Sequence, residues 1–142
     1  VLKYSSAPLL DVSNFYEQVL FSYFTGNSDM HLKNFSLLEK EGQGLQLCPA
    51  YDLVPTALVN PADTEELALT LNSKKRKLKY NDFLVAFENS GLRKKVLDNT
   101  LELFVYAKPE ILTVLEKSFV SDELKLKYAN LIEKRYMELG LK

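Results

Sequence analysis

Seven of the ten residues from 15 to 24 are apolar or aromatic, and they fall on nearly every side of a helix. A helix that is apolar on nearly every side is expected in the centre of a protein rather than at its surface. Ser13 or Asn14 can cap this helix, and Gly26 with the asparagine after it can end it. The pattern therefore predicts a buried central helix over 15–24, preceded by an irregular segment, 1–12.

Two later stretches predict short strands. The first, 35–48, contains a glycine-rich turn at 41–44 and predicts a β-hairpin. In the second, residues 67–71 alternate like a strand, and residues 77–79 can pair back onto them. Residues 57–66, between the two, are predicted to form a loop.

The rest of the chain predicts four helices. Asn81 can cap the first, which should end near Gly91, and the second covers about 93–106. Pro109 is expected to open a third helix, because proline is favoured in the first turn. The last helix begins at 121–123 and carries one apolar face, made of Leu124, Tyr128, Leu131, Ile132, Arg135 and Leu139.

Composition narrows the class of protein. With 142 residues, 46% of them hydrophobic and 26% charged, the chain resembles an ordinary globular domain, so one α+β, mainly α unit is expected over 1–142. The net charge of −1 gives no global reason to expect nucleic acid or membrane as a partner, and no apolar run is long enough to cross a bilayer. The single cysteine, Cys48, cannot form an internal disulfide, which favours a cytoplasmic location.

The candidate chemistry lies between the central helix and the first hairpin. Asp29, His31, Lys33 and Asn34 fall within six positions of one loop, whose two ends are held by regular structure. Asp52 follows Asn34 by eighteen residues, and a tight hairpin would bring it back beside Asn34. Phosphoryl transfer needs such an arrangement. One Asp orients the attacking hydroxyl, and an Asn five residues later binds Mg²⁺ together with a second Asp.

Three segments of the chain, in order, resemble signature blocks of HipA-like serine/threonine protein kinases: residues 26–36, 51–56 and 67–72. Members of that family are bacterial kinases that form the toxin half of toxin–antitoxin pairs. The resemblance implies the helical C-terminal lobe of a protein-kinase-like fold, in which small β-hairpins carry the catalytic loops. It also implies ATP as a substrate, Mg²⁺ as a cofactor, and a protein substrate and an antitoxin as partners.

The same resemblance implies roles for five residues. Asp29 would be the catalytic aspartate, and Asn34 and Asp52 would bind Mg²⁺. His31 and Lys33 would lie in the same loop near the ATP phosphates.

The chain also departs from the wider protein-kinase pattern. Ser28 stands where an arginine precedes the catalytic aspartate, and Leu53 stands where a phenylalanine follows the metal-binding one. No glycine-rich phosphate loop and no strand with an ATP-pairing lysine precedes residue 13, and the hairpin turn explains Gly42 and Gly44. We therefore expect an N-terminal lobe that holds ATP to lie outside this chain, and the isolated chain to be inactive.

Other interpretations remain open at this point. Asp29 and Asn34 are common loop residues that hydrogen-bond to nearby backbone, and a lone histidine such as His31 can be structural. The basic residues of 74–79 fit a solvated turn, or a surface for nucleic acid or an acidic partner. The whole chain could instead be a non-catalytic helical module that binds an antitoxin or another chain. A third interpretation is a Mg²⁺-dependent phosphohydrolase that uses Asp29 and Asp52.

Overall fold

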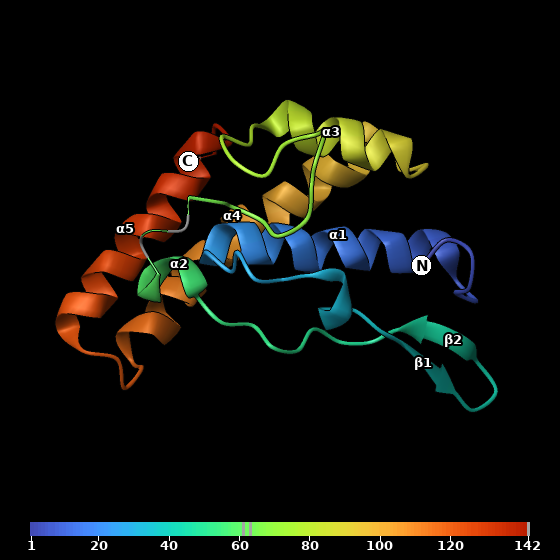
Figure 1. The fold of residues 1–142 in the computed structure, drawn as a ribbon, viewed down its shortest axis with the longest axis horizontal. Helices are drawn as coiled ribbons and strands as arrows, with labels where there is room; N and C mark the ends of the chain where they lie inside the picture. Colours follow the sequence, from blue (N-terminus) through green and yellow to red (C-terminus); the bar gives the residue numbers. More distant parts are fainter. Residues whose placement is uncertain (61, 63, 142) are drawn as a thin grey trace.

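The computed structural model describes residues 1–60, 62 and 64–141 (Figure 1). Helices dominate it, with one small sheet at the edge. In chain order the elements are α1 (Pro8–Thr25), the 3₁₀-helix η1 (Leu32–Asn34), β1 (Leu37–Lys40), β2 (Gly44–Leu47), α2 (Thr56–Val59), α3 (Tyr80–Asn89), α4 (Lys94–Glu116) and α5 (Asp122–Glu138). Within these residues, no helix combines the length and the apolar character that crossing a membrane requires.

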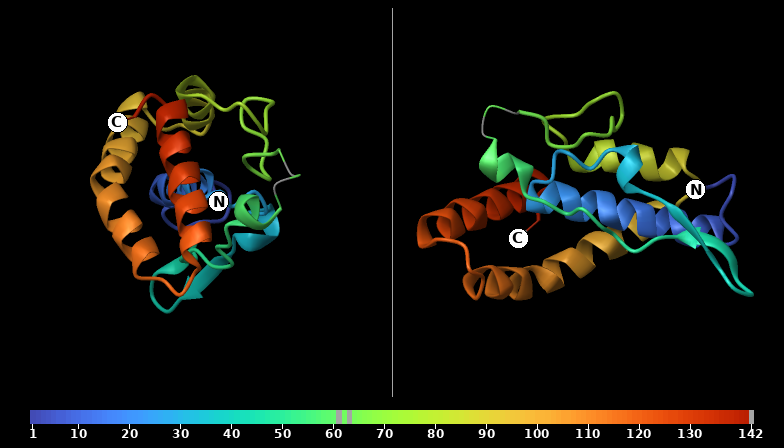
Figure 2. Two further views of the ribbon diagram at one scale, coloured as in Figure 1. Left: turned by 90° about the vertical axis from the view of Figure 1, so that its left-hand side faces the viewer. Right: turned by 60° about the horizontal axis from the view of Figure 1, so that its bottom comes forward.

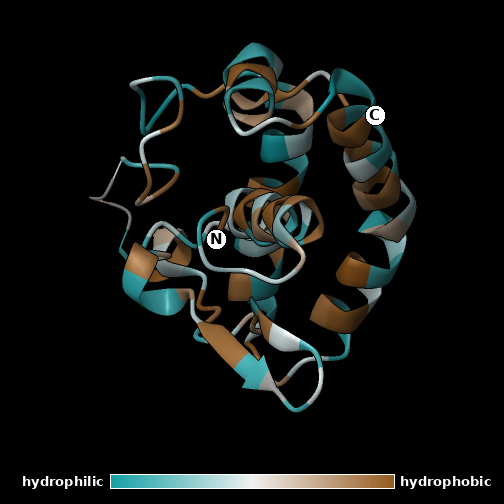
Figure 3. Cartoon of the chain, turned by 90° about the vertical axis from the view of Figure 1, so that its right-hand side faces the viewer, coloured by the Kyte–Doolittle hydropathy of each residue, from teal (hydrophilic) through white to brown (hydrophobic). Residues whose placement is uncertain are grey.

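α1 lies in the centre of the fold, as Figure 3 shows in a view along its axis. The other long helices and the irregular segments surround it, and Val12, Leu20 and Phe24 are among its buried residues. The prediction of a buried central helix is confirmed, but its predicted start is wrong. α1 begins at Pro8, because a proline in the first turn needs no amide hydrogen there and its φ is already helical.

α4 and α5 pack against the C-terminal half of α1 through aromatic rings. The ring centroid of Phe24 lies 4.3 Å from that of Tyr136 and 5.1 Å from that of Phe104. The Tyr136 hydroxyl donates a hydrogen bond to the Phe104 carbonyl (2.9 Å), and burial raises the pKa of Tyr136 to about 12. α5 has the buried face that its pattern predicts, since Ile132 and Leu139 are also buried.

β1 and β2 form the predicted first hairpin, which extends away from the helices near the start of α1 (Figure 2). The strands are antiparallel, with Leu37 opposite Leu47 and Lys40 opposite Gly44. The buried Asp11 carboxylate of α1 accepts a hydrogen bond from the Leu47 amide (2.9 Å). Because a buried carboxylate needs such donors, this bond fixes where the hairpin meets the helix.

The segment 64–79 does not form the predicted second hairpin. Among the described residues, an isolated bridge between Leu71 and Lys74 is the extent of its strand-like pairing. Leu67, Leu71 and Leu78 are instead buried in the core. The alternation that suggested a strand therefore reflects an irregular chain that points apolar side chains inward at intervals.

A buried ion pair anchors this segment to α5. Glu66 and Arg135 are both almost inaccessible, and their charged groups lie 2.7 Å apart. The second carboxylate oxygen of Glu66 accepts a hydrogen bond from the Leu78 amide (2.9 Å). Burial lowers the pKa of Arg135, but the charge and hydrogen bond of Glu66, together with the charges of Tyr23 and Glu138, raise it by more in sum, so the net pKa is raised. The segment is therefore held in one position against the last helix.

The basic residues of 74–79 are largely used inside the chain. Lys74 Nζ lies 2.8 Å from the buried Asp82 carboxylate, and Lys75 Nζ lies 3.1 Å from Glu65. The Lys79 amide also donates to Asp82 (3.0 Å). Asp82 thereby caps α3, and the predicted cap, Asn81, is wrong, because α3 begins at Tyr80, two residues earlier than a cap at Asn81 implies.

One continuous helix, α4, replaces two of the predicted helices. Pro109 lies inside α4 rather than at the start of a new helix. It has no amide hydrogen for the carbonyl four residues before it, so one backbone hydrogen bond is missing there. Phe104 and Leu115, buried on either side of this point, keep both halves of the helix packed on the core. Tertiary packing therefore overrides the local preference of proline.

Candidate functional site

The candidate loop begins where α1 ends. Gly26 adopts a left-handed backbone conformation (φ 70°), and the Asn27 amide returns to the Ser22 carbonyl of the last turn (2.8 Å). A Cβ at Gly26 would lie 2.6 Å from Leu131 Cδ2 and 3.2 Å from Ala57 Cβ. Glycine alone suits both the backbone and the space, so the start of the loop is fixed against α5 and α2.

Asn27 is buried and joins this loop to the chain that follows the hairpin. Its Oδ1 accepts a hydrogen bond from the Asp29 amide (3.2 Å), and its Nδ2 donates to the Asp52 carbonyl (3.4 Å). The sequence pattern indicated only that Asn27 helps to end the helix. No local signal distinguishes a helix-ending asparagine from one that also bridges two loops.

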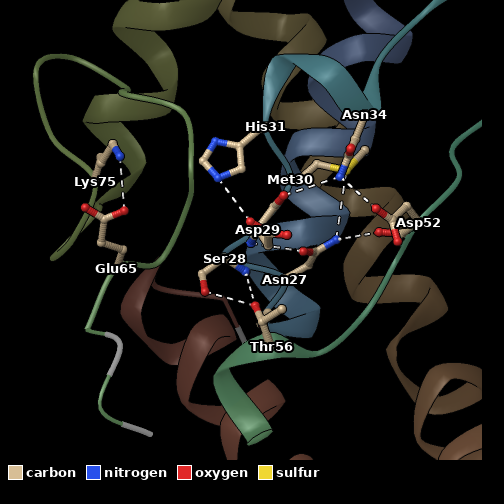
Figure 4. A network of polar contacts seen from close by, with 11 residues as sticks. Asn27, Ser28, Asp29, Met30, His31, Asn34, Asp52, Thr56, Glu65 and Lys75 are labelled. Atoms are coloured by element: carbon tan, nitrogen blue, oxygen red, sulfur yellow. Dashed lines mark hydrogen bonds and ion pairs between the residues drawn. The ribbon is translucent and has the colours of Figure 1, made fainter. Parts of the chain in front are cut away.

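Asn34 lies between the two candidate aspartates, as Figure 4 shows. Its Nδ2 is 3.1 Å from Asp52 Oδ2 and 3.3 Å from the Asp29 carbonyl oxygen. Asn34 is buried at the end of η1, so the position of its amide is well fixed. Asn34 and Asp52 therefore meet, as the length of the hairpin predicts.

The Asp29 carboxylate faces solvent beside His31. His31 Nε2 lies 3.0 Å from Asp29 Oδ1, and both side chains are about half exposed (49% and 53%). The backbone of residues 29–31 forms a tight turn, in which the His31 amide donates a hydrogen bond to the Asp29 carbonyl (2.8 Å). A polar group is thus held at the surface on a fixed backbone.

Lys33 is exposed, and no hydrogen bond or ion pair to its side chain is found within the described part of the chain. Its carbonyl accepts a hydrogen bond from the Tyr51 hydroxyl (3.3 Å). This contact joins the candidate loop to the segment that carries Asp52. Lys33 therefore belongs to the same surface as the other candidate residues, with its ammonium group in solvent.

Thr56 links the candidate loop to the segment that carries Asp52. The sequence pattern did not identify this role. Its Oγ1 accepts a hydrogen bond from the Ser28 amide (2.8 Å) and lies 2.9 Å from Ser28 Oγ (Figure 4). Asp52, four residues earlier, has a positive φ of 55°, so the chain turns sharply between them. α2 occupies the beginning of the predicted loop 57–66, whose residues 61 and 63 lie outside the described ones.

The oxygen atoms of this site suit a hard cation that also binds oxygen atoms of other molecules. Asp52 offers a carboxylate and Asn34 an amide oxygen, and Mg²⁺ prefers oxygen ligands. In the described residues, no three His, Cys, Asp or Glu side chains gather into a group that could hold a metal ion. Mg²⁺ commonly combines one or two carboxylates with substrate phosphates, so the two residues fit that kind of binding.

Comparison with known protein families places this geometry in context. The family described as HipA-like C-terminal domain matches residues 1–110. The chain belongs to this family. The chain also has curated relatives whose names mark them as candidate kinases. One is Y4dM of Sinorhizobium fredii (strain NBRC 101917 / NGR234), 33% identical over 91 residues, and another is a Haemophilus influenzae protein (strain ATCC 51907 / DSM 11121 / KW20 / Rd), 25% identical over 136 residues.

The HipA-like fold is confirmed by a solved structure. The chain matches part of the Shewanella oneidensis MR-1 toxin–antitoxin complex of HipA, HipB and operator DNA, with a TM-score of 0.82 and 19% identity. The match covers 99% of this chain and 34% of the matched one. The predicted fold class, the mainly helical lobe of a kinase-like fold, is therefore correct, although one hairpin rather than two carries the loops.

The HipA-like domain spans only part of the length of its relatives. The matches cover 63% of this chain but 22% of the Sinorhizobium protein, and 84% of this chain but 40% of the Haemophilus protein. Asp29, His31, Lys33, Asn34 and Asp52 stay predicted site residues, now with a defined mutual arrangement. The extent of the domain also stays a prediction.

Proposed function

We propose that this HipA-like domain is the catalytic-loop half of an ATP- and Mg²⁺-dependent serine/threonine protein kinase. The observation that carries the proposal is the position of the Asn34 amide, 3.1 Å from the Asp52 carboxylate and 3.3 Å from the Asp29 carbonyl oxygen. Phosphoryl transfer depends mainly on positioning and charge stabilisation, and it needs a catalytic loop and a metal-binding loop side by side. The kinase names of the relatives point in the same direction.

Asp29 acts on the acceptor hydroxyl in this proposal. The hydroxyl oxygen bonds to the γ-phosphorus of ATP, and the bond from that phosphorus to the bridging oxygen breaks to release ADP. The hydroxyl proton passes to the Asp29 carboxylate and then to solvent. Support comes from the exposure of this carboxylate and from His31, whose Nε2 at 3.0 Å restricts its orientation.

Asn34 and Asp52 would hold Mg²⁺ against the phosphates of the nucleotide. When bound, Mg²⁺ supplies positive charge that offsets the charge of the phosphates during transfer. Within the chain, Asn27 and Tyr51 hold the Asp52 segment beside the catalytic loop through the hydrogen bonds described above. These contacts support a role for Asp52 that depends on its position relative to Asn34.

Lys33 and His31 would contact the phosphates of ATP. Both lie in the surface loop that carries Asp29, and both side chains are exposed. An ammonium group in solvent beside a metal site is suited to phosphate as a point charge. Their roles rest on this placement and on the family.

An N-terminal lobe would cover the site and supply the remaining contacts to ATP. Exposed apolar side chains lie close to the candidate residues in the sequence: Leu38, Tyr51, Leu53 and Val54. A group of exposed apolar side chains is a feature of interaction surfaces. Because this chain matches only a fraction of its relatives, we propose that it transfers no phosphate when isolated.

A second candidate function is that of a module that binds an antitoxin without catalysis. It is favoured by the solved complex that the fold matches, in which HipA is accompanied by HipB and operator DNA. A cytoplasmic location and the absence of direct contact between this domain and nucleic acid belong to the proposal as expectations.

The decisive experiment measures transfer of labelled phosphate from ATP to protein by the full-length protein that carries this chain. Asp29→Asn should lower the rate by about 100-fold or more, because it removes the proton acceptor and keeps the shape. Asp122→Asn is the matched control, since that side chain is fully exposed at the start of α5 and should change nothing. Unchanged transfer by Asp29→Asn would refute the assignment, and antitoxin binding without any transfer would favour the second candidate.

The metal assignment has its own test. Asp52→Asn keeps a residue that tolerates the positive φ and removes the charge, whereas Asn34→Ala removes the amide. Both variants should raise the Mg²⁺ concentration needed for half-maximal nucleotide binding, by about tenfold or more. A titration in which both variants behave as the parent would exclude these residues as ligands.

A further inference from the structure

A groove of about 460 Å³ lies beside the catalytic loop. Side chains of α1, of η1, of the segment 69–72 and of the last turn of α3 line it. Phe15 and Leu69 are among its apolar walls, and Asn89 lies among its polar residues. The groove is thus built from four parts of the chain, none of which carries a candidate metal ligand into it.

The lining of this groove is uncharged. No Asp, Glu, Lys, Arg or His is among its lining residues, although 26% of the whole chain is charged. The lining contains one phenol, that of Tyr16, and its hydroxyl is already hydrogen-bonded. It donates to the Ala86 carbonyl (2.9 Å) and lies 2.7 Å from Ser90 Oγ. An uncharged side chain of apolar character is the occupant that such walls accept at the lowest desolvation cost.

The groove is continuous with the candidate catalytic loop. Leu32 lines it and is 69% exposed, and this residue stands between His31 and Lys33, three positions after Asp29. In Figure 4, Asp29 lies between Asp52 on one side and, on the other, the segment of Glu65 and Lys75 that continues into the groove wall. The segment that supplies part of the groove wall therefore lies on the side of Asp29 away from Asp52, and Leu32 belongs both to the groove and to the candidate loop.

Backbone groups at the edge of the groove are free to pair. Among the described residues, no backbone hydrogen bond involves the amides or carbonyls of Leu69 and Thr70, while the neighbouring bridge joins Leu71 and Lys74. Free amides and carbonyls beside a side-chain pocket suit an extended peptide, whose backbone supplies affinity and whose side chain supplies specificity.

We propose that this groove binds the protein substrate in extended form and receives an uncharged, apolar side chain next to the acceptor serine or threonine. The inference rests on the proposed kinase function and adds the class of sequence that the site accepts. The groove selects the acceptor, and Asp29, Asn34 and Asp52 act on it.

The experiment uses the full-length protein that carries this chain, labelled ATP, Mg²⁺ and a library of serine peptides varied one position at a time. At one position adjoining the serine, Leu or Val should be favoured over Ala by about tenfold, and Lys and Glu should be disfavoured. Phosphorylation that depends on Asp29 but shows no preference at any flanking position would overturn the groove and leave the kinase assignment standing. Absence of any Asp29-dependent phosphorylation would overturn both.

Substitution in the groove tests which surface produces the preference. Asn89 is exposed at the end of α3 and lines the groove, outside the catalytic and metal-binding residues, so Asn89→Glu and Asn89→Lys test the groove through substrate selectivity rather than through rate. The two should shift selection at that one position in opposite directions, toward Lys and toward Glu respectively, by about two- to fivefold. Asn99, an exposed asparagine on α4, provides the same two substitutions away from the groove as controls. Selectivity that is the same in the Asn89 and Asn99 variants would show that the groove does not contact the substrate.

Discussion

Gly26→Ala should destabilise the fold at the point where the candidate loop begins. The substitution adds one methyl group to a backbone with φ of 70°. That methyl group would meet Leu131 Cδ2 at 2.6 Å and Ala57 Cβ at 3.2 Å. Two separate costs therefore apply, one from the left-handed backbone and one from the lack of space.

The two costs have known sizes. A left-handed conformation costs an L-residue about 1–2 kcal/mol, and alanine regains about 0.4–1 kcal/mol because it restricts the unfolded chain. Overpacking adds about 1–3 kcal/mol, and the lower half applies here because the half-buried Leu131 side chain can turn away while Ala57 cannot. The free energy of unfolding should therefore fall by about 2–3 kcal/mol.

Gly42→Ala is the matched control for this measurement. Gly42 has nearly the same φ (73°) in the hairpin turn, but nothing lies within 4 Å of the position that its Cβ would occupy. It should lose only about 1 kcal/mol. Urea denaturation of both variants, followed by circular dichroism, gives the two values. Equal losses in the two variants would refute the claim that the loop is packed tightly against α5.

Three further predictions concern other parts of the fold. Pro109→Ala should raise the free energy of unfolding by about 1–3 kcal/mol in urea denaturation, because it restores a backbone hydrogen bond inside α4, and a loss would show that the proline is required there. Burial alone would raise the pKa of Asp82, but hydrogen bonds, of which the one from Lys74 contributes most, lower it. Native stability should therefore decline as pH falls from about 5, and Asp82→Asn should weaken that decline in acid titrations. Glu66→Gln should cost about 1–3 kcal/mol in thermal or chemical unfolding, because the buried Arg135 loses one of its two carboxylate partners and keeps Glu138 (3.0 Å), and no loss would refute the anchoring role of Glu66.

The sequence pattern predicted the central helix, the first hairpin and the last helix, because each has a local signal: a high apolar content, a glycine-rich turn between two short strands, and one apolar face, respectively. It failed where distant contacts decide the local structure. Pro109 looked like a helix start, but the packing of Phe104 and Leu115 carries α4 through it. Residues 67–71 looked like a strand, but their apolar side chains enter a core formed by helices that lie elsewhere in the sequence.

In the candidate site, too, local features could be predicted from the sequence and long-range contacts could not. The spacing of Asp29, Asn34 and Asp52 was readable because a short hairpin has a nearly fixed geometry. The parts played by Asn27 and Thr56 were not, since each links segments that lie 25 and 28 residues apart, respectively, through hydrogen bonds of 3.4 and 2.8 Å. An isolated asparagine or threonine in a polar loop carries no mark of such a partner.

The packing of α1 against α5 has a consequence for the order in which the protein becomes functional during synthesis. Tyr23, near the end of α1, donates a hydrogen bond to Glu138 (3.3 Å), 115 residues later, and the adjoining Gly26 is backed by Leu131. At translation rates of about 5–20 residues per second, α5 emerges on the order of ten seconds after α1. The nascent chain therefore carries the residues of the candidate loop well before the helix that holds that loop in place. The candidate site of such a chain would remain incomplete on the ribosome until α5 has docked, because the contacts that support the loop span most of the chain.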